Sequence, residues 1–394
     1  MYRSFLSVKN ISRRPLQSIL MIGMTSIVTA LTLLVLLLAL GVYKAFDNAV
    51  SPFQIIIGSK GSSYQLLLNS VFLLDRPLNN FSYDEILKLK EDPLVENVVV
   101  LGFGDNYLGH RIIGTEKNIF NYKIKKNAAE WIEIKDGRTI EKPFEAVIGV
   151  GVLENTGLKV GDRFRSSHGL VQMPTDDHHE DHKDEYLVVG IMKKVNGPYD
   201  RAILVDIKDI WTEHGQNLGS VTSAIIRPTG YKEAMQLAYK YQNNKELQLM
   251  FPAQQIIRFF SLLGNGEKIL KIIVGIIFCI SLIIMGISAY WSAISNSKER
   301  GILRILGARK KDTIYILLGE NIILILIGII VGEIMGHSIF FLMAHLLGSK
   351  TAIMISNSFS SLEVYVVLIM IILDIFAALI PIALVTRKDL LEDL

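Results

Sequence analysis

The sequence predicts a membrane protein with four transmembrane α-helices and a large α+β extracytoplasmic domain inserted between helices 1 and 2. Two observations support this fold class. The 394-residue chain is 50% hydrophobic with a mean hydropathy of +0.37, which is high for a soluble protein and low for a chain made only of spans. Its apolar residues also gather into four long runs, and a long stretch of globular composition follows the first of them.

Each apolar run has the length of a membrane span. A helix rises about 1.5 Å per residue and needs roughly 20 residues to cross a hydrocarbon core of about 30 Å. We therefore assign the transmembrane helices to residues 18–43, 268–296, 313–345 and 362–386. The first run is too long for the apolar core of a signal peptide, and no small-x-small cleavage site ends it, so we expect it to be retained.

The distribution of basic residues predicts the orientation of these spans. Basic residues occur in residues 1–17, in the loop 297–312 and in the tail 387–394, whereas the loop 346–361 has Lys350 as its one basic residue. Cytoplasmic loops carry an excess of Lys and Arg, so both termini and the loop 297–312 should be cytoplasmic. The chain is then a multi-pass protein with residues 44–267 outside the membrane.

Residues 44–267 mix strand-like runs with helical patterns. Short β-branched runs bounded by Gly, Pro, Asn and Asp predict strands at residues 95–100, 111–113, 146–148, 186–191, 202–205 and 224–226. Helical spacing predicts helices over residues 82–90, 207–214 and 231–243. Ser82 and Glu85 form a capping-box pattern at the start of the first of these helices.

Composition and missing motifs exclude several functions. The net charge is +3 and no block is basic enough for a nucleic-acid groove, so we expect no nucleic-acid partner. The single cysteine, Cys279, lies in an apolar run and excludes a disulfide framework. The sequence contains no G-x-x-x-x-G-K-[ST] and no Ser/His/Asp or Cys/His pattern, so we expect no ATPase site of its own and no enzyme activity.

The loop 297–312, SKERGILRILGARKKD, combines charged residues with Ile and Leu at helical spacing and then reaches Gly307. This pattern is typical of a short amphipathic helix on the cytoplasmic face of the membrane. It favours a helix that a cytoplasmic partner can bind, and a simple positive-inside anchor loop is the alternative.

From Lys298 to Asp312 the chain closely resembles ABC-transporter permeases of the FtsX/MacB/LolC kind, the type VII or mechanotransmission family. Their loop between the second and third spans reads approximately K-E-x-G-I-L-R-A-L-G-A-x-x-x-D/Q, and Ile305 in place of Ala is the visible departure here. Residues 147–162 (VIGVGVLENTGLKVGD) and 186–205 (YLVVGIMKKVNGPYDRAILV) resemble strands and turns of the family's MacB-like external domain. One span, a large domain and three further spans is also the family's layout.

The resemblance implies a homodimeric permease in the bacterial cytoplasmic membrane, served by a separate cytoplasmic ABC ATPase dimer. ATP would bind to that partner, and this chain would bind no cofactor directly. The resemblance assigns ATPase coupling to Lys298, Glu299, Arg300, Gly301, Ile302, Leu303, Arg304, Leu306 and Gly307. Among these residues, Glu299, Arg300 and Arg304 would contact the ATPase, the apolar residues would hold the helix to the membrane surface, and Gly307 would end it in a left-handed cap.

Residues 173–185, MPTDDHHEDHKDE, form the most distinctive local feature of the external domain. Imidazole and carboxylate groups together suit zinc, nickel or copper, and residues four apart share one face of a helix. The candidate zinc ligands are Asp177, His178, His179 and His182. The alternative is a solvated acidic loop between two strands that binds no metal. A metal role would add an extracytoplasmic adaptor or metal-binding protein to the expected partners.

Ionisable residues inside the predicted spans form a further group of candidates, because such residues are costly in a bilayer and tend to be functional. They are Glu320, Glu333, His337 and Asp374. They either pair with one another inside the helix bundle or contact a polar or metal substrate. A separate apolar stripe at residues 66–72 of the external domain is interpreted as packing, with a dimer contact or lateral gate as the alternative.

The sequence therefore predicts a permease subunit that couples ATP hydrolysis by a separate ATPase to movement of its external domain. The movement would export or extract a substrate, with a possible link to zinc handling. The alternative function is a transmembrane signal transmitter that transports nothing and activates an extracytoplasmic partner such as a hydrolase.

Overall fold

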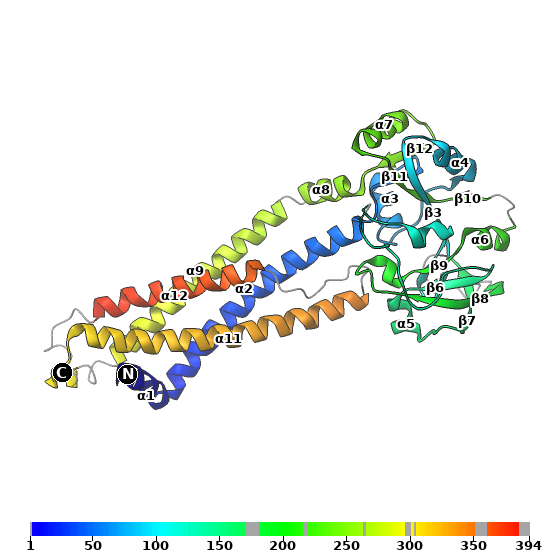
Figure 1. Cartoon of the computed structure of the whole chain (residues 1–394). Coiled ribbons are helices and arrows are strands. Elements are labelled where there is room, and N and C mark those ends of the chain that lie inside the picture. Colours follow the sequence, from blue (N-terminus) through cyan, green and yellow to red (C-terminus); the bar gives the residue numbers. More distant parts are fainter. Residues whose placement is uncertain are drawn as a thin grey trace. The chain divides into compact units, whose positions relative to one another are not determined.

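The structure is a computed structural model that describes residues 2–125, 127–169, 181–215, 219–262, 265–295, 301–302, 305–350 and 361–385. The chain divides into two compact units (Figure 1). A helical unit comprises Met1–Gly41, Leu263–Leu346 and Asn357–Leu394, and an α+β unit comprises Val42–Leu262 and Leu347–Ser356.

In the described part of the chain, five helices contribute to the helical unit: α1 (Tyr2–Arg13), α2 (Pro15–Val50), α9 (Asn265–Ser295), α11 (Lys310–Lys350) and α12 (Ser361–Val385). Within the described residues, four of them, α2, α9, α11 and α12, contain segments long and apolar enough to cross a membrane. This confirms the predicted fold class, because one such helix precedes the α+β unit and three follow it.

Helix α2 is longer than the apolar run that predicts it. Pro15 provides the first helical residue, a position where its missing N–H costs nothing, and the residue before a proline disfavours helix, which separates α1 from α2. At its other end α2 continues to Val50, past the polar residues that end the apolar run. Ala49 and Val50 are buried in the core of the α+β unit, so tertiary packing supports a helix that hydropathy does not register.

Three glycines of α11 allow it to pack closely on α2. A Cβ atom built on Gly328 would lie 2.6 Å from the Thr25 Cβ, and one on Gly332 would lie 2.6 Å from the Thr29 Cβ. At Gly336 the same atom would lie 3.2 Å from a backbone oxygen of α2. A hydrogen bond also joins the helices, because the Ser26 hydroxyl donates to the Gly328 carbonyl at 3.0 Å. Small residues spaced by four are typical of helix interfaces in membranes.

A second contact region of the helical unit is aliphatic. Its buried residues come from α2, α9, α11 and α12 and include Met21, Met285, Leu324, Ile325 and Ala378. Large apolar side chains elsewhere on these helices remain exposed, as expected for surfaces that face lipid.

The α+β unit contains short strands and helices. Its strands are β1 (Ile55–Ser59), β2 (Phe81–Ser82), β3 (Val95–Tyr107), β4 (His110–Thr115), β5 (Ile134–Gly137), β6 (Glu145–Ile148), β7 (Arg163–His168), β8 (Asp181–Met192), β9 (Ile203–Asp206), β10 (Ser220–Val221), β11 (Ser223–Pro228) and β12 (Leu247–Met250). Its helices are α3 (Ser63–Ser70), α4 (Tyr83–Glu91), η1 (Lys117–Asn121), α5 (Val150–Thr156), η2 (Pro198–Arg201), α6 (Ile207–Glu213), α7 (Tyr231–Gln242) and α8 (Pro252–Leu262).

Strand β3 connects the two parts of the main sheet. Its first half pairs with β11 in the antiparallel order β12-β1-β11-β3. Its second half pairs with both β4 and β7, and the pairings β3-β4-β9-β6-β8-β7 return to β3, so these strands form a closed ring. Closure removes open sheet edges, which otherwise invite pairing with other chains.

Neighbouring residues of the ring strands contribute to different cores, as the two-residue period of a strand requires. In β4, Ile112 packs with Ile148 and Ile203, whereas Ile113 packs in the cluster that contains Phe53 and Tyr199. A third core lies under α4 and α7 and includes residues of β1, β3 and β11.

The strands predicted from sequence overlap β3, β4, β6, β8, β9 and β11, and the predicted helices overlap α4, α6 and α7. Ser82 caps α4, but its hydroxyl accepts from the Asp84 N–H at 3.2 Å. Glu85 forms an ion pair with Lys88 at 2.5 Å. The Ser82–Glu85 pattern therefore predicts the start of α4 correctly. The Ser82 hydroxyl, however, accepts from the N–H of the second helical residue and not of the third, as a capping box requires.

A buried carboxylate stabilises the ring at β6. Glu145 is 3% exposed, and Arg138 donates to it from both terminal nitrogens, from Nη1 at 2.6 Å. The Arg138 guanidinium lowers the pKa of Glu145 to about 2, and two backbone N–H groups, those of Glu141 and Lys142, add to the effect. Glu145 therefore stays ionised throughout the physiological pH range.

We expect Gly332→Leu to destabilise the helical unit, because the new side chain would force α11 away from Ser26 and Thr29 of α2. Overpacking of this kind costs about 1–3 kcal/mol. Thermal unfolding of the purified protein in detergent would measure the loss. Gly275→Leu is the matched control, because no atom lies within 4 Å of a Cβ at Gly275. Equal unfolding temperatures for the two variants would contradict the close contact.

Candidate functional site

The described part of the predicted coupling segment contains one helical turn that ends at a glycine. Gly301 and Ile302 are helical, and the Leu306 N–H donates to the Ile302 carbonyl at 3.0 Å. Gly307 then adopts a φ of +97°, in the left-handed region that favours glycine. Lys298, Glu299, Arg300, Leu303 and Arg304 lie outside the described residues.

Apolar side chains of this segment are exposed. Ile302 is 56% exposed, Ile305 66% and Leu306 78%, whereas Gly301 is buried. Three adjacent exposed aliphatic residues form a surface that suits either the membrane interface or a protein partner. The residue that departs from the family pattern, Ile305, belongs to this surface.

The last residue of the motif starts the next helix. Asp312 accepts a hydrogen bond from the Arg309 N–H at 3.0 Å, and its own N–H donates to the Arg309 carbonyl at 2.8 Å. Asp312 lies in the first turn of α11, where a carboxylate satisfies an otherwise unpaired N–H and interacts well with the helix dipole. The coupling segment is therefore joined to α11 by a defined cap.

Hydrogen bonds place the N-terminal segment at the same end of the helical unit as the coupling segment. The Ser7 hydroxyl of α1 donates to the Ile316 carbonyl of α11 at 3.0 Å. Arg14 donates from Nη1 to the Ser295 hydroxyl, at the end of α9, at 2.8 Å. Two of the three basic regions of the sequence thus share one end of this unit.

The ionisable residues of the predicted spans have distinct environments. His337 Nδ1 donates to the Glu333 carbonyl at 3.2 Å, and His337 Nε2 lies 3.3 Å from Glu363 Oε2. Glu363 is 2% exposed and lies in the first turn of α12. The sequence predicts that these candidates pair with one another or contact a substrate; the structure places Glu363, which is not among the candidates, beside His337. The position of Glu363 at the start of an apolar run was the available signal.

Three further polar residues of the spans are buried. Glu320 is 4% exposed, Asn321 1% and Asp374 1%. Asn321 donates from Nδ2 to the Leu317 carbonyl of its own helix at 2.8 Å. Burial of this kind keeps polar groups away from lipid, as a membrane span requires.

The candidate metal residues are largely outside the described part of the chain. Asp177, His178 and His179 lie outside the described residues. His182 belongs to strand β8 and is not in a helix, so the prediction that His178 and His182 share one helix face does not hold for His182. The intervening segment connects β7 and β8, which pair antiparallel. Among the described residues, no group of three or more His, Cys, Asp or Glu side chains could hold a metal ion.

The apolar stripe of the external domain contributes to its core. Leu66, Leu67, Val71 and Phe72 are buried in the cluster that also holds Ile113, while Leu68 is 38% exposed. Four of the five stripe residues therefore have a packing role.

Comparison with protein families identifies both units of the chain. Residues 18–237 match the MacB-like periplasmic core domain, which is more than half of the chain. Residues 271–390 match the FtsX-like permease C-terminal domain. The chain belongs to the MacB/FtsX-like family of ABC-transporter permeases. As a member of this family, the permease is a subunit embedded in a bacterial membrane. The family also implies partnership with a cytoplasmic ABC ATPase.

Two solved structures are similar to about half of the permease chain. The extracellular domain of the noncanonic ABC-type transporter YknZ from Gram-positive bacteria is 15% identical, with a TM-score of 0.31, and the match covers 50% of this chain and 98% of that chain. The periplasmic region of MacB from Actinobacillus actinomycetemcomitans is 10% identical, with a TM-score of 0.36, and the match covers 53% of this chain and 95% of that chain. No curated protein sequence matches the permease.

We expect Glu363→Gln to destabilise the permease by about 1–3 kcal/mol, because it removes the carboxylate that faces a partly buried imidazole. Chemical denaturation in detergent would measure the change. Glu333→Gln is the matched control, since Glu333 contacts His337 through its backbone carbonyl. A double-mutant cycle with His337→Gln isolates the pair, and additive effects would contradict a direct interaction.

Proposed function

We propose that the permease couples ATP hydrolysis by a separate cytoplasmic ABC ATPase to movement of its extracytoplasmic domain. The observation that carries this proposal is the motif at 298–312, which lies between two helices long enough to span the membrane. Its described residues form a short helical turn with exposed aliphatic side chains, a surface suited to docking.

The helical packing supports a mechanical route from this segment. Asp312 joins the segment to α11, and α11 packs against α2 through Gly328 and Gly332. Helix α2 then continues without a break to Val50, which is buried in the core of the α+β unit. A continuous helix transmits a displacement with little loss, because its backbone hydrogen bonds resist bending. ATP-driven motion at the coupling segment would thus reach the external domain.

The remaining parts of the proposal follow the family. Two copies of the permease would face an ATPase dimer, with both termini and the coupling segment in the cytoplasm. ATP would bind to the ATPase, since the chain has no G-x-x-x-x-G-K-[ST] sequence. The motion would serve export or extraction of a substrate.

A reversed charge or a newly introduced charge in the coupling segment should uncouple the ATPase. We expect Glu299→Lys and Leu303→Asp each to reduce ATPase binding and permease-stimulated ATP hydrolysis more than about tenfold, because unpaired charges at an interface cost several kcal/mol. Co-purification from detergent and ATP hydrolysis in reconstituted vesicles would measure both effects.

Glu91→Lys provides the control for this experiment, because it reverses the charge of an exposed residue in the α+β unit. It should leave binding and hydrolysis unchanged. If both variants of the coupling segment retain stimulation, the assignment of this segment fails.

The alternative function is a signal transmitter that moves no substrate and activates an extracytoplasmic partner such as a hydrolase. The same coupling route would serve it. Vesicles that contain the permease and its ATPase separate the two functions. ATP-dependent extraction or movement of a lipid, lipoprotein or peptide supports transport, whereas ATP-dependent activation of a soluble external partner supports transmission.

A link to zinc rests on residues 173–185 alone, where Asp177, His178, His179 and His182 supply the donor types that zinc prefers. An adaptor or metal-binding protein outside the membrane would then be a partner. Deletion of residues 175–184 from the full chain should abolish zinc binding measured by equilibrium dialysis. His214→Gln, outside the deleted segment, is the control, and unchanged zinc affinity after the deletion would remove this link.

A further inference from the structure

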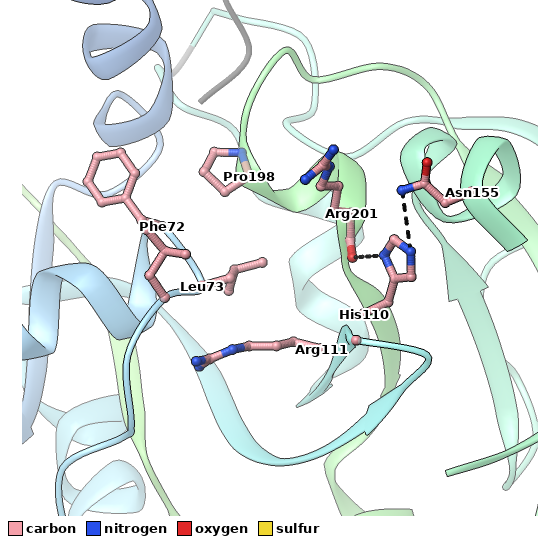
Figure 2. A pocket seen from close by; sticks show the side chains of 9 residues that line it. Phe72, Leu73, His110, Arg111, Asn155, Pro198 and Arg201 are labelled. Carbon is pink, nitrogen blue, oxygen red and sulfur yellow. Dashed lines mark hydrogen bonds between the residues drawn. The ribbon is translucent and has the colours of Figure 1, made fainter. Parts of the chain in front are cut away.

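Figure 2 shows a pocket of the α+β unit with a volume of about 280 Å³, which residues of β4, α5 and η2 help to line. Its polar groups interact with one another and with nearby backbone. His110 Nδ1 donates to the Arg201 carbonyl at 3.1 Å, and His110 Nε2 lies 3.5 Å from Asn155 Nδ2. Arg111 donates to the Asp75 carbonyl. These contacts join β4 to α5 and η2, so we interpret the pocket as part of the packing of this unit.

In the helical unit, two of the four spans are longer than a bilayer requires. The apolar segments of α9 and α12 contain 21 and 24 residues, whereas those of α11 and α2 contain 34 and 36. At about 1.5 Å per residue, the two shorter segments cover roughly 31–36 Å, close to a hydrocarbon core of about 30 Å. The segment of α11 covers about 51 Å, and a steep tilt of about 40° still leaves about 39 Å. Helices α2 and α11 therefore extend past the hydrocarbon core.

The four helices share one level at the end of the unit that carries the coupling segment. Arg14, next to the start of α2, donates to the Ser295 hydroxyl at the end of α9, and α1 is bonded to the second turn of α11. Helices α9 and α12 run in the same direction, because α11 crosses back between them. A Cβ on Gly286 of α9 would lie 3.7 Å from the Ala377 carbonyl oxygen of α12, and equal counts from this contact bring Ser295 to the end of α12. The surplus length of α2 and α11 therefore lies at the opposite end.

At that opposite end, α9 and α12 leave the hydrocarbon core while α2 and α11 continue. His337 Nε2 of α11 lies 3.3 Å from Glu363 Oε2 in the first turn of α12, and the preceding residue of α11 packs on Leu33 of α2. The count from the contact between α9 and α12 brings Ile272 to the same level, and the part of α9 before it, NGEKILK, is largely polar. Beyond this level α2 and α11 both remain helical.

The continuations of α2 and α11 are apolar. Residues 34–43 of α2 read LVLLLALGVY, and residues 338–344 of α11 read SIFFLMA. Phe341 is 62% exposed and Leu342 58%. Contact of such side chains with water is unfavourable, and exposed apolar surfaces of this kind mark sites of interaction with a protein or a membrane.

The exposed apolar stripe of α11 continues a surface suited to lipid. Ile327, Ile330, Ile334 and Phe341 are all exposed, and steps of three or four residues through Ser338 place them on one side of the helix. The Ser338 hydroxyl donates to the Ile334 carbonyl at 2.7 Å, so its polar group is satisfied within the helix. A protein interface usually has a polar rim, whereas this stripe passes from the span to Phe341 through a satisfied hydroxyl. The continuity favours hydrocarbon chains as the occupant.

We propose that α11, packed on α2, binds the hydrocarbon chains of phospholipids beyond the level at which α9 and α12 leave the bilayer core. The chains lie along the stripe as far as Phe341 and Leu342, and the bilayer thickens locally to cover them, which is one response to a span that exceeds the membrane. In the orientation predicted from the basic residues, this is the extracytoplasmic leaflet. The binding needs neither ATP nor the ATPase, so it is independent of the proposed coupling.

Spin labels on single cysteines identify what covers the stripe. The permease with Cys279→Ser and Phe341→Cys is labelled with a nitroxide and placed in phospholipid nanodiscs without the ATPase. Electron paramagnetic resonance then measures access of oxygen, which concentrates in hydrocarbon, and of a water-soluble nickel chelate. We expect oxygen access at Phe341→Cys as high as at Ile334→Cys, the reference within the span. Nickel access should be at least about tenfold lower than at Glu91→Cys, the water-exposed reference, because polar groups are excluded from hydrocarbon.

A label on α9 shows whether the chains are raised locally. The same count places Lys268 of α9 level with Phe341, so Lys268→Cys should be open to nickel. Leu342→Cys repeats the measurement on α11 if Phe341→Cys does not fold. Nickel access on α11 would mean that water covers the stripe, and low access to both reagents would mean that a second copy or another protein covers it. Oxygen-rich surroundings on both α9 and α11 would mean that the ordinary bilayer reaches this level. Each of these three results would overturn the proposal.

Discussion

The close contact between α2 and α11 is the constraint on which the helical unit depends. In a bilayer, apolar side chains gain little free energy when they move from lipid into a helix interface. Helices therefore associate through tight packing and interhelical hydrogen bonds. Gly328, Gly332 and Gly336 provide that packing, and the bond from Ser26 to Gly328 provides a polar contact. The same contact joins the helix that begins at the coupling segment to the helix that enters the α+β unit.

The rigidity of the α+β unit depends on its main sheet. Strand β3 belongs both to an open antiparallel sheet and to a closed ring, so the two parts share a rigid element. The ring is reinforced by the ion pair of Glu145 with Arg138. Such rigidity suits the proposed mechanical coupling, and it also supports a pocket that β4, α5 and η2 help to line.

Polar residues within the spans are positioned by the tertiary structure. His337 was a candidate on sequence grounds because ionisable groups are rare in lipid, and the structure supplies its partner in Glu363. The glycines of α11 could have been found as a G-x-x-x-G-x-x-x-G pattern, since spacing by four puts them on one helix face. Which helix that face contacts could not be predicted, because any neighbouring helix with small residues would satisfy the pattern.

The sequence by itself determined the four apolar helices, the large α+β insertion, the major strands and the coupling motif. These features follow from local rules. A lipid bilayer requires long apolar helices, and side chains alternate between the two faces of a strand. Ser82 begins a helix because its hydroxyl accepts a backbone hydrogen bond, and Gly307 ends one because glycine adopts a positive φ. Only the tertiary structure decided ring closure, the Glu363 partner and the pocket around Arg111. Those features join residues distant in the chain, and their energies depend on burial and contacts that no local pattern records.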